Sequence, residues 1–485
     1  MKHTLRKTLP TLLSAAFSLS AYATNGMNME GYGPVAAAMG GAGMAYDNGT
    51  AALMNNPATL ALMQDGTRLD LAAGFLGPNV KSNGQSSGGT AYVMPAFGIT
   101  HKKNDLVFGF GVFAQGGMGT EYSNAGYYKG LTSMMGNSPV NGGDPGLHNR
   151  SEVGIGRALI PLAWKVNDQL TVGGSIDYVW ATMDLQMLID GKNFGGMGMP
   201  GGSKFGSASG SMMTGLNNAM LGGMVSDVQW GYFNFSDNND FSGKAKGGGV
   251  AGKLGFTYKL SPVLSIGASY HSKTSMSDLQ ADNASMTLRA SYTALAAGAI
   301  LPPGTPAGSY NATLSGKIKV QNFEWPEMIG FGFSYTPDDQ WQLVGDYRRI
   351  GWASVMKRFQ MTFDVSSDAS NGGFANTRLD VAMNQNWKDQ HVLMLGAAYK
   401  FTPKLTLRGG VNLANNPVPS DVTNPLFPAI IKNHLTGGFG YAFDAKSSLD
   451  FAASYAPKVK VQSEFSNTEI SHSQLNAQIM YSMFF

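Results

Sequence analysis

The sequence has no cysteine, few charged residues and no long apolar run after its first 23 residues. Charged residues make up 13% of the 485 residues, about half their share in ordinary soluble domains. Without cysteine, a disulfide scaffold is excluded. No basic stripe of the kind that nucleic-acid binders carry is present. No later segment reaches the roughly 18 consecutive apolar residues of a membrane-spanning helix.

Glycine and aromatic residues are abundant instead. The chain contains 64 glycines and is 11% aromatic, whereas glycine usually makes up about 7% of a chain. The aromatic content and the low charge argue against a disordered chain. This composition, with hydrophobic residues spread in alternation, suits a large all-β protein, including a membrane barrel.

The first 23 residues have the pattern of an export signal. Lys2, Arg6 and Lys7 precede a short apolar core at residues 9–19, and Ala21-Tyr22-Ala23 fits a small-x-small cleavage site. Cleavage there leaves 31 basic and 31 acidic residues, so the formal net charge falls from +3 to zero. A buried N-terminal helix is the alternative. We expect an exported protein of a Gram-negative outer membrane.

From Thr67 onward, apolar and polar residues alternate in segments separated by turn residues, as they do in β-strands with two unlike faces. The last segment shows the pattern clearly, with Leu475, Ile479 and Tyr481 on one face and Asn476 and Gln478 on the other. The chain divides into about fourteen such strands, at 67–76, 92–101, 106–115, 152–165, 169–187, 246–259, 263–279, 314–335, 340–360, 387–401, 404–413, 433–442, 447–463 and 473–485. The strand at 314–335 contains Pro326 and could be two strands.

The lengths of the connections separate a barrel from a soluble sandwich. Tight turns alternate with long connections along the whole series, the turns at 102–105, 166–169, 260–263, 336–340, 402–404 and 443–446. Outer-membrane barrels have an even strand number, short periplasmic turns and long external loops. The pattern therefore predicts an all-β fold, a transmembrane antiparallel β-barrel over residues 66–485. Because many strands exceed the roughly 9–11 residues that span a bilayer, the barrel should project beyond it.

Residues 24–65 precede the barrel and do not alternate. This segment is apolar, but it is too short and too rich in glycine to span lipid. Its apolar content argues against a tail trailing in water. We therefore expect an N-terminal hatch folded into the barrel, with short helices at 35–39 and 51–63.

Several motifs occur in an order that resembles a known family. They are Gly40–Ala45 with Asn56–Leu60, Trp325–Met328, Leu407–Gly410 with Pro417–Pro419, Gly437–Phe443, and the terminal Phe485. Together they resemble the outer-membrane long-chain fatty acid and aromatic hydrocarbon transporters of the FadL family (FadL, OmpP1 and TodX type). The resemblance implies a fourteen-stranded barrel with an N-terminal hatch, passive uptake of hydrophobic molecules and a monomeric state. The size and Met/Gly-richness of segment 188–245 depart from the family.

The methionine-rich segment 187–225 is the candidate for an external apolar groove. Methionine is flexible and suits surfaces that accept varied apolar shapes, and exposed apolar patches often mark binding sites. The candidate ligand-binding residues are Met197, Met199, Met212, Met213, Leu216, Met220 and Met224, the last five near helical spacing in a helix at 211–226. Tyr127, Tyr128, Met134 and Met135 could form an opposite wall. The alternative is a loop that packs on itself or on the barrel rim.

Two further sets of residues are candidates for gating and for binding a ligand carboxylate. The resemblance assigns a gating role to Asn56, Pro57 and Ala58, although Asn-Pro is also a common turn. Our hypothesis is that a ligand displaces the hatch and opens a path through the barrel wall or floor. Arg157, Lys317 and Arg348 lie in predicted strands and could face a carboxylate. The alternative is structural pairing with Asp177, Asp346 and Asp450, and an aromatic hydrocarbon needs no cation.

Other functions stay open at this stage. A general porin for small polar solutes should carry a charged constriction, and a surface adhesin or receptor would use the long loops. An enzyme is not expected, because the seven histidines are scattered and neither G-x-S-x-G nor H-E-x-x-H occurs. We likewise expect no cofactor, no metal site and no nucleic-acid partner.

Overall fold

The computed structural model describes residues 25–122, 146–239, 243–464 and 466–485. The predicted signal peptide lies outside the described residues. So do Tyr127, Tyr128, Met134 and Met135, the proposed opposite wall of the groove.

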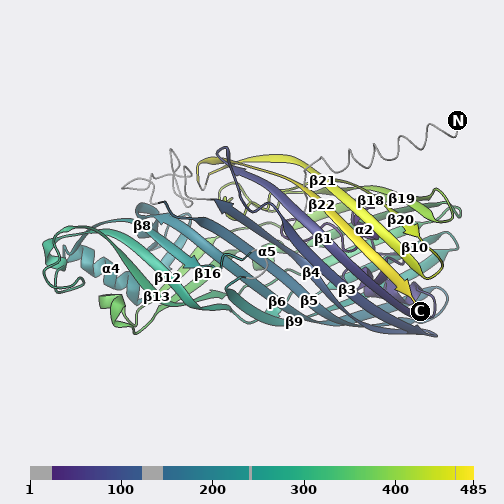
Figure 1. Ribbon diagram of the computed structural model, residues 1–485, viewed down its shortest axis with the longest axis horizontal. Helices are drawn as coiled ribbons and strands as arrows, with labels where there is room; N and C mark the ends of the chain where they lie inside the picture. The colour runs from purple at the N-terminus through teal and green to yellow at the C-terminus, as the bar shows by residue number, and fades with distance from the viewer. Residues whose placement is uncertain (1–24, 123–145, 240–242, 465) are drawn as a thin grey trace.

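The described strands form one antiparallel sheet that closes on itself into a long barrel (Figure 1). The pairings run once around the barrel and return from the last strand to the first. A closed ring leaves no free sheet edge, which a sheet in lipid requires. The ring consists of β1 (Gly66–Ser82), β3 (Tyr92–Lys103), β4 (Leu106–Tyr122), β5 (Asn149–Lys165), β6 (Leu170–Asp190), β9 (Ala245–Ser261), β10 (Leu264–His271), β14 (Met328–Tyr335), β15 (Trp341–Ile350), β18 (Gln390–Lys400), β19 (Leu405–Ala414), β20 (His434–Ala442), β21 (Ser447–Ser463) and β22 (Thr468–Phe484).

A further group of strands, here called the extension, continues the sheet at the end of the barrel opposite the C-terminus (Figure 1). It is joined to the ring where β8 pairs with the end of β6. In pairing order it contains β8 (Val225–Phe235), β12 (Leu279–Tyr292), β13 (Gly308–Gln321), β16 (Arg358–Val365), β17 (Arg378–Asn384) and β7 (Gly206–Ser209). The helices and short strands of the connections are α3 (Gly191–Met197), α4 (Ser211–Leu221), α5 (Trp352–Val355), η3 (Ala294–Ala296), η4 (Ala369–Phe374), β2 (Gln85–Ser86) and β11 (Ser275–Met276).

The predicted transmembrane barrel is confirmed, and the ring that closes it has the expected fourteen strands; the extension and the short strands of the connections bring the described sheet to 22. Segment 314–335 is two strands, β13 and β14, with Pro326 between them, because proline cannot donate a ladder hydrogen bond. Segment 340–360 is likewise interrupted by α5. The connections predicted at 188–245 and 280–313 contain extension strands, including β8 and β12.

The tight turns occur where the sequence predicts them, all at the end of the barrel that carries the C-terminus. The turn between β3 and β4, for example, consists of Asn104 and Asp105, and Asn104 has a φ of 55°, which asparagine tolerates. Strand lengths also agree with a barrel that projects beyond the bilayer, because β4 and β5 have 17 residues each and β6 has 21. No helix in the described part of the chain is long and apolar enough to cross a membrane.

The two faces of the wall differ as expected for a barrel in lipid. Large apolar side chains are exposed on the outer face, among them Phe75, Phe108, Ile160, Leu254, Phe331, Leu393 and Tyr455. The inner face carries glycines and buried polar side chains, including Arg157, Asp177, Lys253, Asp346, Arg348, Asn412 and Asn476. The alternation read from the sequence therefore places its apolar face outward.

Residues 25–65, here called the hatch, pack against the inner face of the wall near the tight turns. They contain α2 (Pro34–Ala37) and two short 3-10 helices, η1 (Gly49–Leu53) and η2 (Pro57–Leu62). The helix η2 contacts β5, β6 and β9, while α2 contacts β20, β21 and β22. The expected helix at 51–63 is thus split into two 3-10 turns at Asn55 and Asn56.

Wall glycines allow the hatch to lie this close. An added Cβ at Gly98, Gly173, Gly267, Gly396 or Gly410 would collide with hatch atoms of Thr50, Ala58, Met44, Met39 and Gly40, respectively. Because glycine has no side chain, the hatch backbone can approach the sheet directly on several sides of the barrel. We call these wall glycines the hatch cradle, and they explain part of the high glycine content.

Candidate functional site

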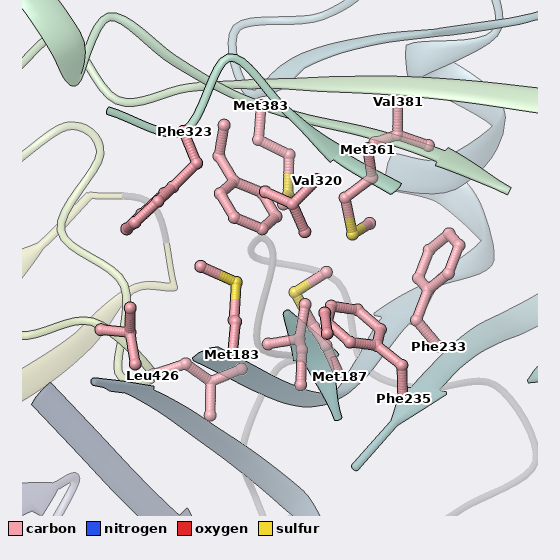
Figure 2. Packing of buried hydrophobic residues seen from close by; sticks show 14 of the residues in the cluster. Met183, Met187, Phe233, Phe235, Val320, Phe323, Met361, Val381, Met383 and Leu426 are labelled. Carbon is pink, nitrogen blue, oxygen red and sulfur yellow. The ribbon is translucent and has the colours of Figure 1, made fainter. Parts of the chain in front are cut away.

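Beyond the hatch, the lumen enclosed by the end of β6 and the extension strands is filled by apolar side chains that converge from opposite walls. Figure 2 shows Met183 and Met187 of β6 and Phe233 and Phe235 of β8 facing residues of the opposing strands, with Leu426 of a long connection beside them. The opposing residues are Val320, Phe323, Met361, Val381 and Met383. All of these side chains are buried. We call this region the apolar chamber. Because methionine adapts its shape readily, the chamber is a deformable apolar medium.

Most methionines of the predicted groove belong to the buried core that includes this chamber rather than to the outer surface. Met197, Met212, Met213 and Leu216 are at most 4% exposed and pack within that core. The helix α4 occupies residues 211–221, within the predicted range. Packing on the barrel rim, the alternative to an open groove, describes these four residues.

The exposed part of the segment lies at the far tip of the extension. Met199 and Met220 are 63% and 42% exposed, and Met224 is half-buried. Leu221, at the end of α4, is 87% exposed. The backbone of Thr293, which precedes η3, donates a hydrogen bond to the Met224 carbonyl (3.0 Å), so α4 and η3 lie together at this tip. A small apolar surface therefore faces the outside.

The predicted cations lie in three different environments. Arg157 of β5 donates from Nη1 to Asp177 Oδ2 at 2.8 Å, and Lys253 Nζ lies 2.5 Å from the same oxygen, with all three side chains buried. The structural pairing predicted as the alternative holds for Arg157. Lys317 lies on an exposed face of β13 and pairs with Asp282 at 3.1 Å, away from the lumen.

Arg348 of β15 differs from the other two cations. Its side chain is buried, and its Nη1 has no hydrogen-bond partner in the described part of the chain. Asp346, on the same face of β15, instead accepts hydrogen bonds from the backbone of Gly43 (2.6 Å) and Met44 (3.1 Å) in the hatch. Arg157 also has a nitrogen without a partner, Nη2, so Arg348 differs from it in having no ion pair among the described residues.

The Asn56-Pro57-Ala58 turn joins the hatch to the wall. Asn56 donates from Nδ2 to the Met44 carbonyl (2.7 Å) and to the Phe256 carbonyl of β9 (3.1 Å), while its Oδ1 accepts from the Ala58 backbone (3.1 Å). Thr171 of β6 donates to the Ala58 carbonyl at 3.0 Å. The turn thus caps η2 and docks it on β6 and β9. Its gating role stays a prediction.

The start of the hatch is held by aromatic and carboxyl groups. Trp325 donates from Nε1 to Asn28 Oδ1 at 3.2 Å, and its ring packs edge-on against Trp352 at a centroid distance of 5.2 Å. Glu30 accepts hydrogen bonds from Ser454 (2.6 Å) and Asn476 (3.1 Å) on β21 and β22. Burial raises the pKa of the Glu30 carboxyl above its usual range, which favours the protonated form.

The barrel wall has a gap beside β3. This strand pairs with β1 only as far as Leu76 opposite Tyr92, and with β4 only as far as Ala96 opposite Phe113. Beyond these points β1 continues along β22, and β4 continues along β5 to Tyr122. No ladder in the described residues joins β1 and β4 directly, and the far end of the opening is bounded by Ser87 and Gly88, which donate to the carbonyls of Val80 in β1 (2.9 Å) and Glu121 in β4 (2.7 Å). We call this opening the wall gap.

Local sequence explains the wall gap. Pro78 and Pro95 lie in β1 and β3 next to it, and proline cannot donate to a neighbouring strand. A bulge interrupts the β4–β5 ladder between Ala114 and Gly116, and such irregularities bend a strand. On the inner side, Gly117 donates its backbone hydrogen to the Met27 carbonyl of the hatch at 3.0 Å. The start of the hatch therefore borders the gap.

A cavity of about 350 Å³ occupies the wall gap. Its lining includes neighbouring residues of β5 that point to opposite faces of the wall, Val153 and Ile155 inward and Gly154 and Gly156 outward. The remaining lining includes Leu76, Val80, Tyr92, Val93, Phe113, Met118, Trp180, Thr182, His472 and Gln474. Because both faces contribute, the cavity reaches from the lumen side to the lipid side. Sequence reasoning missed this site, although prolines and a Gly-Gly pair inside strands were the available signals.

Comparisons with known proteins agree with this architecture. A family model described as outer membrane protein transport protein (OMPP1/FadL/TodX) matches residues 11–482. The crystal structure of the toluene transporter TodX of Pseudomonas putida is 29% identical with a TM-score of 0.76, and the match covers 94% of this chain and 99% of that one. The crystal structure of the toluene transporter TbuX of Ralstonia pickettii is 32% identical with a TM-score of 0.73, and the match again covers 94% of this chain and 99% of that one.

Matches to curated sequences are shorter. A long-chain fatty acid transport protein of Escherichia coli is 24% identical over 159 residues, which is 33% of this chain and 32% of that protein. The chain spans less than half of the curated relatives that it matches, 41% and 32% of their lengths.

Proposed function

This chain belongs to the family of outer membrane protein transport proteins that includes OMPP1, FadL and TodX, and we propose that it conducts monoaromatic hydrocarbons passively across the outer membrane. The observation that carries the proposal is the wall gap, whose cavity has an apolar lining on both faces of the barrel. An apolar solute that reaches this cavity can leave sideways into lipid without crossing water. Passive movement needs no energy source, only an apolar path.

The path begins at the extension. The exposed apolar tip at Met220 and Leu221 offers a first contact for a solute arriving from outside. The apolar chamber lies between this tip and the hatch, and its methionine side chains can move aside for a small ring. The hatch closes the end near the tight turns, because its backbone lies directly against wall glycines. The wall gap is therefore the proposed exit.

The choice of monoaromatic ligands rests on two observations. The chain matches solved toluene transporters over nearly its full length, whereas its match to the fatty acid transport protein covers a third of it. In addition, Arg157 is fully buried and already donates hydrogen bonds to Asp177 and Gln115. A general porin is disfavoured because the lumen is filled by apolar side chains and by the hatch.

A fatty acid is the second candidate, and Arg348 favours it. A buried guanidinium with an unpartnered nitrogen beside the hatch could bind a ligand carboxylate. Uptake of radiolabelled toluene and of radiolabelled oleate by a strain lacking its own transporter of this family separates the two. We expect expression of the chain to raise toluene uptake about tenfold and oleate uptake little. Oleate uptake alone, lost in Arg348→Met, would assign the fatty acid function instead.

A further inference from the structure

The cavity in the wall gap has polar residues at two places, His472 and Gln474 on the inner face of β22, here called the polar corner, and Glu152 and Thr182 on β5 and β6. Most other lining groups are aliphatic, aromatic or glycine. A volume of about 350 Å³ falls within the usual range of small-molecule pockets, in which a few polar groups orient an otherwise apolar ligand. The polar corner therefore lies where it could distinguish ligands that carry a polar group from ligands that do not.

The hydrogen bonding of His472 defines what this corner offers. Its Nδ1 lies 2.9 Å from the Pro428 carbonyl oxygen, which can only accept, so Nδ1 carries the hydrogen and donates it. In this neutral tautomer, Nε2 presents a lone pair. Nε2 is buried and forms no hydrogen bond of ordinary geometry in the described part of the chain, although the Gln474 side chain interacts with the imidazole. A buried acceptor without a donor is unfavourable, and a ligand that supplies the donor removes that cost.

We propose that His472 makes this corner a binding subsite for monoaromatic molecules with a hydroxyl or amino group. The aromatic ring would pack against Phe113 and Ile155 in the apolar part of the cavity, and the O–H or N–H would donate to Nε2 of His472. This inference rests on the proposed function, since it assumes that the cavity is on the path of the ligand. It extends the ligand class from plain hydrocarbons to aromatic alcohols and phenols.

The test compares two isomeric ligands on the full-length protein purified in detergent. Benzyl alcohol and anisole contain the same atoms, but only benzyl alcohol has an O–H donor. Each is used to displace radiolabelled toluene from the wild type and from His472→Asn. Asparagine can still donate to the Pro428 carbonyl, so the neighbouring connection keeps its anchor, but it lacks the Nε2 acceptor.

We expect His472→Asn to raise the concentration of benzyl alcohol needed for half displacement about fivefold, the typical net effect of one hydrogen bond. Anisole should be unaffected. Thr406→Val, on β19 away from the cavity lining, should change neither value. Equal shifts for both isomers in His472→Asn, or no shift for either, would overturn the subsite. Absence of specific toluene binding to the wild type would instead overturn the proposed function, and this inference with it.

Discussion

At the scale of single residues, the inner face of the wall combines glycines with buried polar groups, and both serve the hatch. Gly173 and Gly267 let hatch backbone touch the sheet, while Asp346 accepts two hatch backbone hydrogens. The docking turn at Asn56 adds hydrogen bonds to the hatch itself and to β9. Removing one partner of such a buried pair costs about 1–3 kcal/mol. The hatch is therefore held by many small contributions around the barrel.

Glu30 makes hatch docking sensitive to pH. Burial raises the pKa of its carboxyl, so the folded state binds its proton more tightly than the unfolded state does. The protonated Glu30 carboxyl therefore contributes fully to the free energy of unfolding below the pKa of an unfolded glutamate. This contribution is lost as the pH rises through the higher pKa of the folded state. We expect Glu30→Gln to unfold at nearly the same temperature as the wild type at pH 4 and at a higher temperature at pH 9. Thermal unfolding in detergent at both values measures the difference. A difference independent of pH would contradict this role.

The sequence could assign residue types to faces but not to partners. Arg157, Lys317 and Arg348 were all predicted on strands. Only the fold shows that the first is paired with Asp177, that the second is outside the lumen, and that the third is buried with no ion pair among the described residues. The three residues look alike in the linear pattern, because cross-strand partners are set by sheet register. The methionines near α4 were likewise identified, but their burial depends on the extension that surrounds them.

At the scale of elements, the tight turns and the outward apolar faces follow directly from local sequence. The extension does not, because the connection predicted at 188–245 holds β7, β8 and two helices that become stable only when they pack over the apolar chamber. The wall gap depends on a strand that stops short of its neighbours. Strand ends are set by pairing with distant segments, so alternation alone does not locate them.

If cargo leaves through the wall gap, the floor of the barrel, which is the end near the tight turns that the hatch closes, need not open. Cross-linking the hatch to the barrel wall tests this. In Met44→Cys with Gly330→Cys, the new cysteines replace two residues in contact, because a Cβ on Gly330 would lie 3.3 Å from Met44 Sδ. The chain has no other cysteine, so a short thiol cross-linker joins only this pair.

We expect toluene uptake by the cross-linked variant to stay within about twofold of the reduced variant. The reduced double variant is the matched control for the substitutions themselves. Uptake that disappears on cross-linking and returns on reduction would assign the exit to the floor of the barrel.

At the scale of the whole molecule, low charge and high glycine content have separate explanations. The outer wall faces lipid and the lumen is largely apolar, so neither needs many charges. Glycines line the hatch cradle and also the wall gap, where Gly116, Gly117, Gly154 and Gly156 leave space that side chains would fill. The molecule is thus a barrel closed near its tight turns, with an apolar interior and an opening in its side.

The central claim is that cargo leaves through the wall gap, and filling the gap tests it most directly. Among the described residues, a Cβ on Gly154 would have only Thr182 Oγ1, at 3.6 Å, within 4 Å, so Gly154→Trp places its side chain in the cavity without a clash with the described backbone. Gly409→Trp places the same side chain on β19, where the nearest atom is the Thr436 carbonyl oxygen at 3.9 Å, and serves as the control. We predict that Gly154→Trp lowers toluene uptake at least about tenfold and that Gly409→Trp leaves it unchanged. Wild-type uptake by a folded Gly154→Trp protein would contradict the account.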